Sequence, residues 1–162
     1  MENIDFELEN RLRNEALAAA AVYDPQTGVG CCGDRVSVDS PEQGAGRVMV
    51  PRTMTDDPAW TSSLGNVTEW RRLRCRYDFE YWAATCVTIK HKTEGCDTRL
   101  RLNRAQRRVL AVLESDRTAG RPIRMIVLKA RQWGGSTLVQ MYMAWIQSVS
   151  YTHLTLPTTS RV

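Results

Sequence analysis

The chain has 162 residues, of which 43% are hydrophobic and 25% are charged. This is the composition of a globular protein with one domain, or one domain plus an extension, and it excludes collagen-like, wholly disordered and disulfide-rich classes. The net charge of +4 is unevenly divided, because residues 1–68 carry 5 basic and 11 acidic side chains and residues 69–162 carry 17 and 7. Of the 22 basic residues 19 are arginine, which suits phosphate recognition but also fits a GC-rich genome.

The N-terminus and the cysteines indicate an intracellular protein. The first residues are acidic and lack the apolar segment of a secretory signal. The five cysteines are odd in number, and their spacing matches neither a zinc site nor a disulfide framework, so we expect reduced, mostly buried thiols. No window of about 18 apolar residues occurs, and we therefore expect no membrane span.

Residues 1–68 divide into a helical and an irregular part. An alanine run at 18–21 predicts a helix over 1–24, which ends at Asp24-Pro25 because proline disfavours an α conformation before it. Residues 25–68 are rich in glycine and proline, with short β-like stretches at 35–38 and 47–50. We expect a linker or loosely ordered arm there.

A basic cluster opens the next segment, residues 69–89. It consists of Arg71, Arg72, Arg74 and Arg76, and it either follows a nucleic-acid backbone or forms a solvated helix face. The apolar residues after it recur at the spacing of one helical face: Phe79, Trp82, Ala83 and Cys86. Residues 98–102 then alternate as a short, half-buried strand does.

Residues 103–149 follow the order of a phosphate-binding loop. A helix over 103–117 is predicted to bury Val109, Leu110, Val112 and Leu113 and to expose Arg104, Arg107 and Arg108. The apolar run 123–128 predicts a strand buried on both faces of a parallel sheet. A glycine turn and an apolar helix over 137–148 follow, so we expect an α/β fold.

The glycine turn offers several of the groups that a nucleoside triphosphate needs. Gly134 corresponds to the second glycine of the usual pattern, and Ala130 lies near the first. Ser136 stands where the hydroxyl that binds magnesium is expected, with Thr137 as a second choice. Gly135 occupies the position of the usual lysine, so the pattern itself is not met.

Two cations near the turn could replace that lysine: Lys129 at the end of the predicted strand and Arg131 inside the loop. Taken alone, a Gly-Gly-Ser-Thr turn is more often an ordinary entry into a helix than a nucleotide site.

The loop Lys-Ala-Arg-Gln-Trp-Gly-Gly-Ser-Thr-Leu at 129–138, with Leu-Asn-Arg-Ala-Gln at 102–106 upstream, resembles the start of the ATPase domain of large terminase subunits, the DNA-packaging motors of tailed bacteriophages. The resemblance implies a truncated P-loop NTPase fold, preceded by the N-terminal helix and the Gly/Pro-rich arm, that binds ATP and Mg²⁺. It implies that Lys129 takes the role of the loop lysine and that Arg131 is a catalytic residue that senses the γ-phosphate. Ala130, Gln132, Trp133 and Thr137 would complete the binding loop, and Ser136 would be the metal ligand.

The same resemblance implies that Gln106 contacts adenine, since a side-chain amide both donates and accepts. Spacing supports another interpretation. Asn103 and Gln106 stand three residues apart at a helix start, as in a capping box.

The complete protein would, by this resemblance, be an ATP-dependent motor that packages double-stranded DNA into procapsids and also cleaves it. Its implied partners are the small terminase subunit, the portal protein and further copies of itself on the portal. It would act in the host cytoplasm, transiently at the procapsid portal and without a membrane. The alternative function is a non-catalytic, basic DNA-binding or assembly module whose arginines contact phosphate.

No Asp or Glu follows Asp116 in this chain. An ATPase of this class needs a later strand ending in carboxylates for magnesium and for the attacking water. Residues 150–162 leave the helical pattern abruptly and look like translated sequencing adaptor, a non-native tail. We therefore expect an N-terminal fragment in which residues 69–149 begin the ATPase domain and which is itself inactive.

Overall fold

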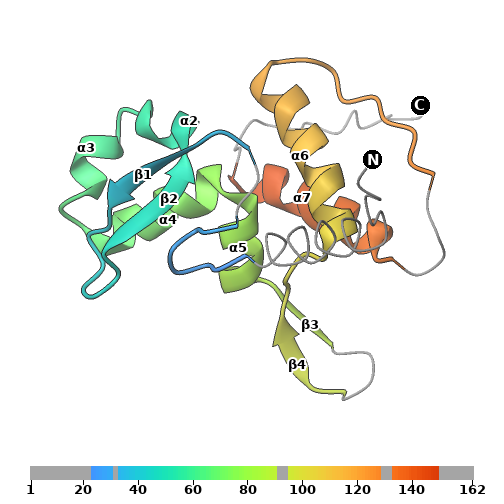
Figure 1. Ribbon diagram of the computed structural model, residues 1–162, viewed down its shortest axis with the longest axis horizontal. Coiled ribbons are helices and arrows are strands. Elements are labelled where there is room, and N and C mark those ends of the chain that lie inside the picture. The colour runs from blue at the N-terminus through green and yellow to red at the C-terminus, as the bar shows by residue number, and fades with distance from the viewer. Residues whose placement is uncertain (1–22, 31–32, 91–94, 129–132, 150–162) are drawn as a thin grey trace, which may run out of the picture.

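The computed structural model describes residues 23–30, 33–90, 95–128 and 133–149, which form a mixed α/β structure (Figure 1). Two small antiparallel sheets and six helices make up its regular elements. In chain order they are β1 (Arg35–Asp39), β2 (Arg47–Pro51), α2 (Arg52–Thr55), α3 (Trp60–Ser63), α4 (Val67–Tyr77), α5 (Phe79–Cys86), β3 (Thr88–Lys90), β4 (Asp97–Arg99), α6 (Arg104–Thr118) and α7 (Gly135–Val149). Most of the helix predicted over 1–24 and the tail 150–162 lie outside the described residues.

The expectation of a loose arm over 25–68 is wrong for much of that stretch. Strands β1 and β2 pair as a hairpin in which Val36 faces Val50 and Val38 faces Val48. The hairpin packs on α4 through a set of buried residues that we call the hairpin core: Val48, Val50, Met54, Trp70 and Leu73. The two β-like stretches pair with each other, and the apolar face of the hairpin packs on α4. The glycines between the elements serve as turns.

Polar side chains set the ends of α4 and α5. The Asn66 side chain accepts the backbone N–H groups of Thr68 at 2.9 Å and Glu69 at 3.3 Å. Asp78 is fully buried, separates the two helices and accepts the N–H of Tyr81 at 3.2 Å. Its carboxylate also receives the Arg35 guanidinium at 2.7 Å, which ties β1 to the helix corner. The caps at the starts of α4 and α5 satisfy N–H donors that have no partner within the helix.

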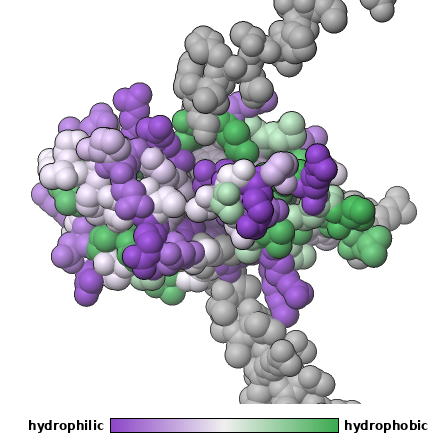
Figure 2. Space-filling view, turned by 90° about the horizontal axis from the view of Figure 1, so that it is seen from above, coloured by the Kyte–Doolittle hydropathy of each residue, from purple (hydrophilic) through white to green (hydrophobic). Residues whose placement is uncertain are grey.

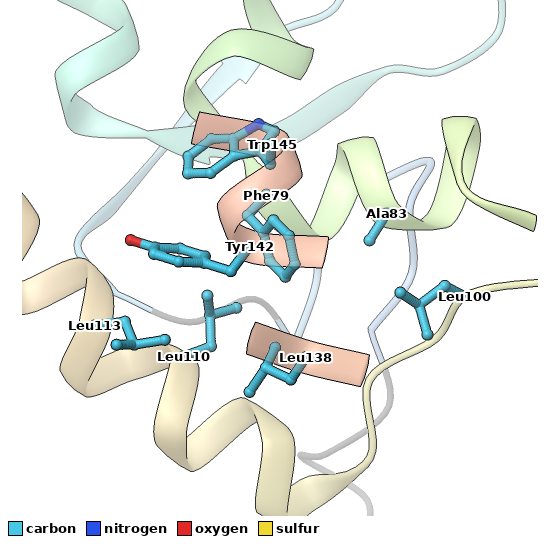
Figure 3. Packing of buried hydrophobic residues seen from close by; sticks show 8 residues of the cluster. All are labelled: Phe79, Ala83, Leu100, Leu110, Leu113, Leu138, Tyr142 and Trp145. Atoms are coloured by element: carbon cyan, nitrogen blue, oxygen red, sulfur yellow. The ribbon is translucent and has the colours of Figure 1, made fainter. Parts of the chain in front are cut away.

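A second cluster, which we call the helix core, lies between α5, α6 and α7 (Figure 3). Its buried members are Phe79, Ala83, Leu100, Leu110, Leu113, Leu138, Tyr142 and Trp145. Figure 3 shows the three aromatic rings of Phe79, Tyr142 and Trp145 gathered at its centre. Phe79 meets the other two edge-on, with centroids 5.4 and 5.5 Å apart. The predicted helical face of α5 is thus confirmed at Phe79 and Ala83, although Cys86 is exposed.

Helix α6 confirms the predicted helix over 103–117, but two of its side chains face opposite to expectation. Arg107 was expected on the outer face and is only 7% exposed. Its Nε donates to Glu80 Oε1 at 2.7 Å, so the helix carries a buried ion pair toward α5. Val112 was expected inside and is 49% exposed. The helical period gives the spacing of residues on a face, but the elements packed against the helix decide which face is buried.

Strand β4 confirms the predicted strand over 98–102 in part. It pairs antiparallel with β3, with Thr88 opposite Arg99 and Lys90 opposite Asp97. This second hairpin projects from the body of the protein below α5 and α6 (Figure 1). Both sheets are two-stranded and antiparallel.

The prediction of a central strand over 123–128 is wrong. The segment has no regular secondary structure, and no described strand pairs with it. Met125 packs against the helix core, whereas Ile126 is 94% and Leu128 97% exposed. Figure 2 shows apolar surface near its right-hand edge, the side on which Figure 1 places this segment. A strand needs a neighbour for its backbone groups, and apolar composition alone does not supply one.

Burial of the other predicted features is mixed. Trp145 of α7 is only 2% exposed, whereas Val139 and Met143 of the same helix are 48% and 56% exposed. Cys75 is half-buried, and Cys86 and Cys96 are exposed. The prediction of mostly buried thiols is therefore wrong for the described cysteines. Within the described residues no helix combines the length and apolar character that crossing a membrane would require.

Candidate functional site

The candidate site lies where the start of α6 meets the start of α7. We call it the α6–α7 junction and define it by Asn103, Gln106, Trp133 and Gly134. Gly134 has a φ of +82° and ends the turn. The first bond of the following helix runs from the N–H of Leu138 to the carbonyl of Gly134, at 3.1 Å. The backbone N–H groups of Gly135, Ser136 and Thr137 therefore have no hydrogen-bond acceptor within the helix, and an anion is favoured at such a helix start.

The start of α6 carries the predicted capping box. Gln106 N–H donates to Asn103 Oδ1 and Asn103 N–H donates to Gln106 Oε1, both at 2.9 Å. The same two side chains reach the turn before α7. Asn103 Nδ2 donates to the Trp133 carbonyl at 3.0 Å, and Gln106 Nε2 donates to the Gly134 carbonyl at 2.8 Å. The capping residues of one helix thus hold the entrance of the other.

Both glycines of the turn have packing reasons to be glycine. A Cβ at Gly134 would lie 2.6 Å from Gln106 Nε2, and the positive φ already disfavours any other residue. A Cβ at Gly135 would lie 2.5 Å from Cζ2 of the Trp133 ring. The turn is therefore built tightly around Gln106 and Trp133.

The position of Gln106 bears on its two interpretations. Its side chain is 5% exposed, and both polar atoms of its amide already have partners within the protein. One N–H and one lone pair of the amide remain for a further partner. An adenine edge could meet them only if the surface over the junction opens.

An open groove of about 600 Å³ adjoins the junction. It is lined by Arg104, Ala105, Arg108, Val109, Val127, Leu128 and Trp133. Arg104 and Arg108 are exposed, stand four residues apart on α6, and form no ion pair with a described carboxylate. The groove therefore combines a cationic rim with an apolar and aromatic floor next to the turn.

The other predicted site residues are placed as follows. Ser136 is exposed in the first turn of α7, and its neighbour Thr137 is half-buried. Lys129, Ala130, Arg131 and Gln132 lie outside the described residues. Among the residues that are described, no three His, Cys, Asp or Glu side chains come together as a metal site would require.

The basic cluster of α4 is largely neutralised. Arg71 Nε lies 2.8 Å from Glu42, Arg72 lies 4.0 Å from Glu69, and Arg76 lies 3.5 Å from Asp57. Arg74 is 1% exposed, and its guanidinium stacks over the Tyr81 ring at 4.1 Å. The solvated-face interpretation therefore fits the exposed, ion-paired Arg71, Arg72 and Arg76, whereas Arg74 is part of the packed interior.

Sequence reasoning missed one role of a junction residue and two residues of the adjoining groove. Asn103 was identified only as a helix cap, but its Nδ2 also holds the Trp133 carbonyl. Arg104 and Arg108 were assigned to the outer face of α6, without the groove that they line. The capping-box spacing was a signal for the first, whereas the groove depends on where Val127, Leu128 and Trp133 lie.

The chain matches no family model, no curated protein and no solved structure.

Proposed function

We propose that this chain is the ATP-binding, N-terminal part of a DNA-packaging ATPase of the terminase large-subunit class. The observation that carries the proposal is the bond from Gln106 Nε2 to the Gly134 carbonyl. A glutamine upstream of a glycine turn is what the resemblance requires, and the two meet at the entrance of α7.

The hydrogen-bond donors and the hydroxyl group near the junction would suit a triphosphate with bound magnesium. Gln106 packs against Gly134 and fixes the turn, and the N–H groups that begin α7 are suited to phosphate oxygens. The exposed hydroxyl of Ser136 would hold the metal. When bound, Mg²⁺ neutralises charge on the phosphates. Arg104 and Arg108 would add positive charge at the groove, while Trp133 offers an aromatic wall for a base.

The implied partners of the complete protein follow from the same proposal: double-stranded DNA, the small terminase subunit, the portal, and further copies of the chain. On α4, Arg71, Arg72 and Arg76 each face a carboxylate, so this helix offers DNA little unpaired positive charge. ATP binding is therefore the property to test first.

We expect Gln106→Ala to raise the Kd for ATP about thirtyfold more than the Kd for an abasic ribose triphosphate. Two hydrogen bonds to the purine would be lost from the first ligand and none from the second, at about 1 kcal/mol each. Isothermal titration calorimetry on the chain with Mg²⁺ measures both constants. Equal weakening of the two ligands would show that Gln106 acts only as a cap and brace.

A matched pair of variants separates these roles. Gln106→Glu keeps an oxygen for the Asn103 N–H but has no N–H for the Gly134 carbonyl, so it removes the brace and retains the cap. Gln140→Ala, at an exposed position of α7, is the control and should leave both constants unchanged. Failure of the unaltered chain to bind ATP would overturn the proposed function.

Lys129 and Arg131 are expected to divide their effects. Lys129→Ala should mainly weaken ATP binding, because the long lysine side chain that follows the apolar residues 123–128 would contact the β- and γ-phosphates in the ground state. Arg131→Ala should mainly lower turnover, because its fork is suited to charge that develops during transfer. Binding is measured on this chain, and turnover on a longer protein that supplies the catalytic carboxylate. The reverse pattern would exchange the two roles.

A further inference from the structure

Two cysteines meet at the corner between α4 and α5. Cys75 lies in the last turn of α4, Cys86 is the last residue of α5, and their Sγ atoms are 3.9 Å apart. Asp78 alone separates the helices, and its buried ion pair with Arg35 helps to hold the corner in place. A disulfide has an S–S distance of about 2 Å, so bond formation needs an approach of roughly 2 Å, within reach of side-chain rotation.

The two thiols differ in access. Cys86 is exposed, and its Sγ lies 3.5 Å from the Thr85 hydroxyl. Cys75 is half-buried and packs against the cluster of Tyr23, Tyr81 and Ala84. Burial, together with the neighbouring Cys86, raises the pKa of the Cys75 thiol to about 12. An external reagent therefore meets Cys86 first, and Cys75 is placed to react second.

We propose that Cys75 and Cys86 form a redox modification site that closes to an intramolecular disulfide by exchange with a low-molecular-weight disulfide. The Cys86 thiolate attacks one sulfur of the reagent, forms a mixed disulfide and releases one thiolate. Cys75 loses its proton to solvent and attacks the Cys86 sulfur, which releases the second thiolate. The protein loses two electrons and two protons, and the reagent is reduced to two thiols.

The site is connected to α7. The backbone carbonyl of Cys75 accepts the indole N–H of Trp145 at 2.8 Å, and Trp145 is buried in the helix core. Closure would restrain the end of α4 at the point where it contacts the helix that begins at Gly135. None of these contacts involves the residues of the α6–α7 junction, so thiol exchange does not depend on ATP binding.

Peptide mapping tests the proposal directly. The reduced chain is treated with glutathione disulfide, remaining thiols are blocked in acid, and the protein is digested with trypsin without reductant. Cleavage after Arg74, Arg76 and Lys90 places the two cysteines in separate peptides, 75–76 and 77–90. The expected product is these two peptides joined, with a mass two hydrogens below their sum.

The neighbouring pair Cys86 and Cys96 is the internal control. In the unfolded chain the two pairs close loops of nearly equal length, so they should form at similar rates. In the folded chain we expect the 75–86 pair to exceed the 86–96 pair by at least about tenfold, and the preference should vanish in denaturant. Similar yields of the two pairs under native conditions would overturn the proposal.

Three variants assign the steps. Cys75→Ser should accumulate the glutathione adduct on Cys86, and Cys86→Ser should give neither the adduct at 86 nor the joined peptides. Cys96→Ser should leave the yield of joined peptides unchanged. A stable adduct on Cys86 in the unaltered chain, without joined peptides, would show that Cys75 does not complete the exchange and would refute the site.

Discussion

Replacement of Phe79 by alanine is expected to lower the free energy of unfolding by about 3–5 kcal/mol, the usual cost of removing a buried aromatic ring. Phe79 is 2% exposed and joins three other aromatic residues, with ring centroids 5.9 Å from Trp82, 5.4 Å from Tyr142 and 5.5 Å from Trp145. The rings of α5 and α7 leave a cavity when Phe79 is removed. Such a loss is a large part of the total stability of a domain, which is typically about 5–15 kcal/mol.

Urea unfolding followed by far-ultraviolet circular dichroism measures this change. Val112→Ala is the control, because Val112 is 49% exposed on α6, and we expect a change within about 0.5 kcal/mol. A loss below about 1 kcal/mol for Phe79→Ala would show that α5 and α7 do not pack through this ring.

The chain itself is expected to release no phosphate from ATP above background, even with Mg²⁺ and DNA. Loss of a general base alone costs about 10²–10⁴-fold in rate, and this chain has no carboxylate beyond Asp116. The last two acidic side chains in the sequence, Glu114 and Asp116, already accept hydrogen bonds from other side chains of the protein. Glu114 accepts from Arg117 and Tyr142, and Asp116 accepts from Arg121. None of these is placed at the turn before α7.

A phosphate-release assay on the purified chain checks this expectation. Ser136→Ala serves to identify the source of any activity, since it removes the hydroxyl expected to bind the metal. Turnover that survives the substitution comes from a contaminant. Turnover that disappears with it would show that the chain supplies its own catalytic base, contrary to the argument from the carboxylates.

Outcomes at the junction and at the thiols separate the two proposals. ATP binding that depends on Gln106 would support the ATPase class whatever the thiols do, and we expect exchange at Cys86 whether or not ATP binds. If the chain binds duplex DNA with strong salt dependence but no ATP, the DNA-binding or assembly module becomes the better interpretation.

Local features of this protein could be predicted from the amino-acid sequence because they depend on neighbours in the chain. The helices α6 and α7 follow from their apolar period and from the turn at Gly134, whose positive φ agrees with glycine. The capping box of Asn103 and Gln106 follows from their spacing, and both of its bonds are present. The short β-like stretches at 35–38 and 47–50 correspond to β1 and β2, although their pairing was not predicted.

Only the tertiary structure decided what those elements pack against. Residues 123–128 are apolar enough for a buried strand, yet Leu128 is exposed because no described strand pairs with it. Arg107 is buried because Glu80, on another helix, receives it at 2.7 Å. The meeting of Cys75 with Cys86 and of Gln106 with Gly134 likewise depends on how helices turn at their ends. Period and propensity act over a few residues, whereas burial, pairing and site geometry are set by partners distant in the chain.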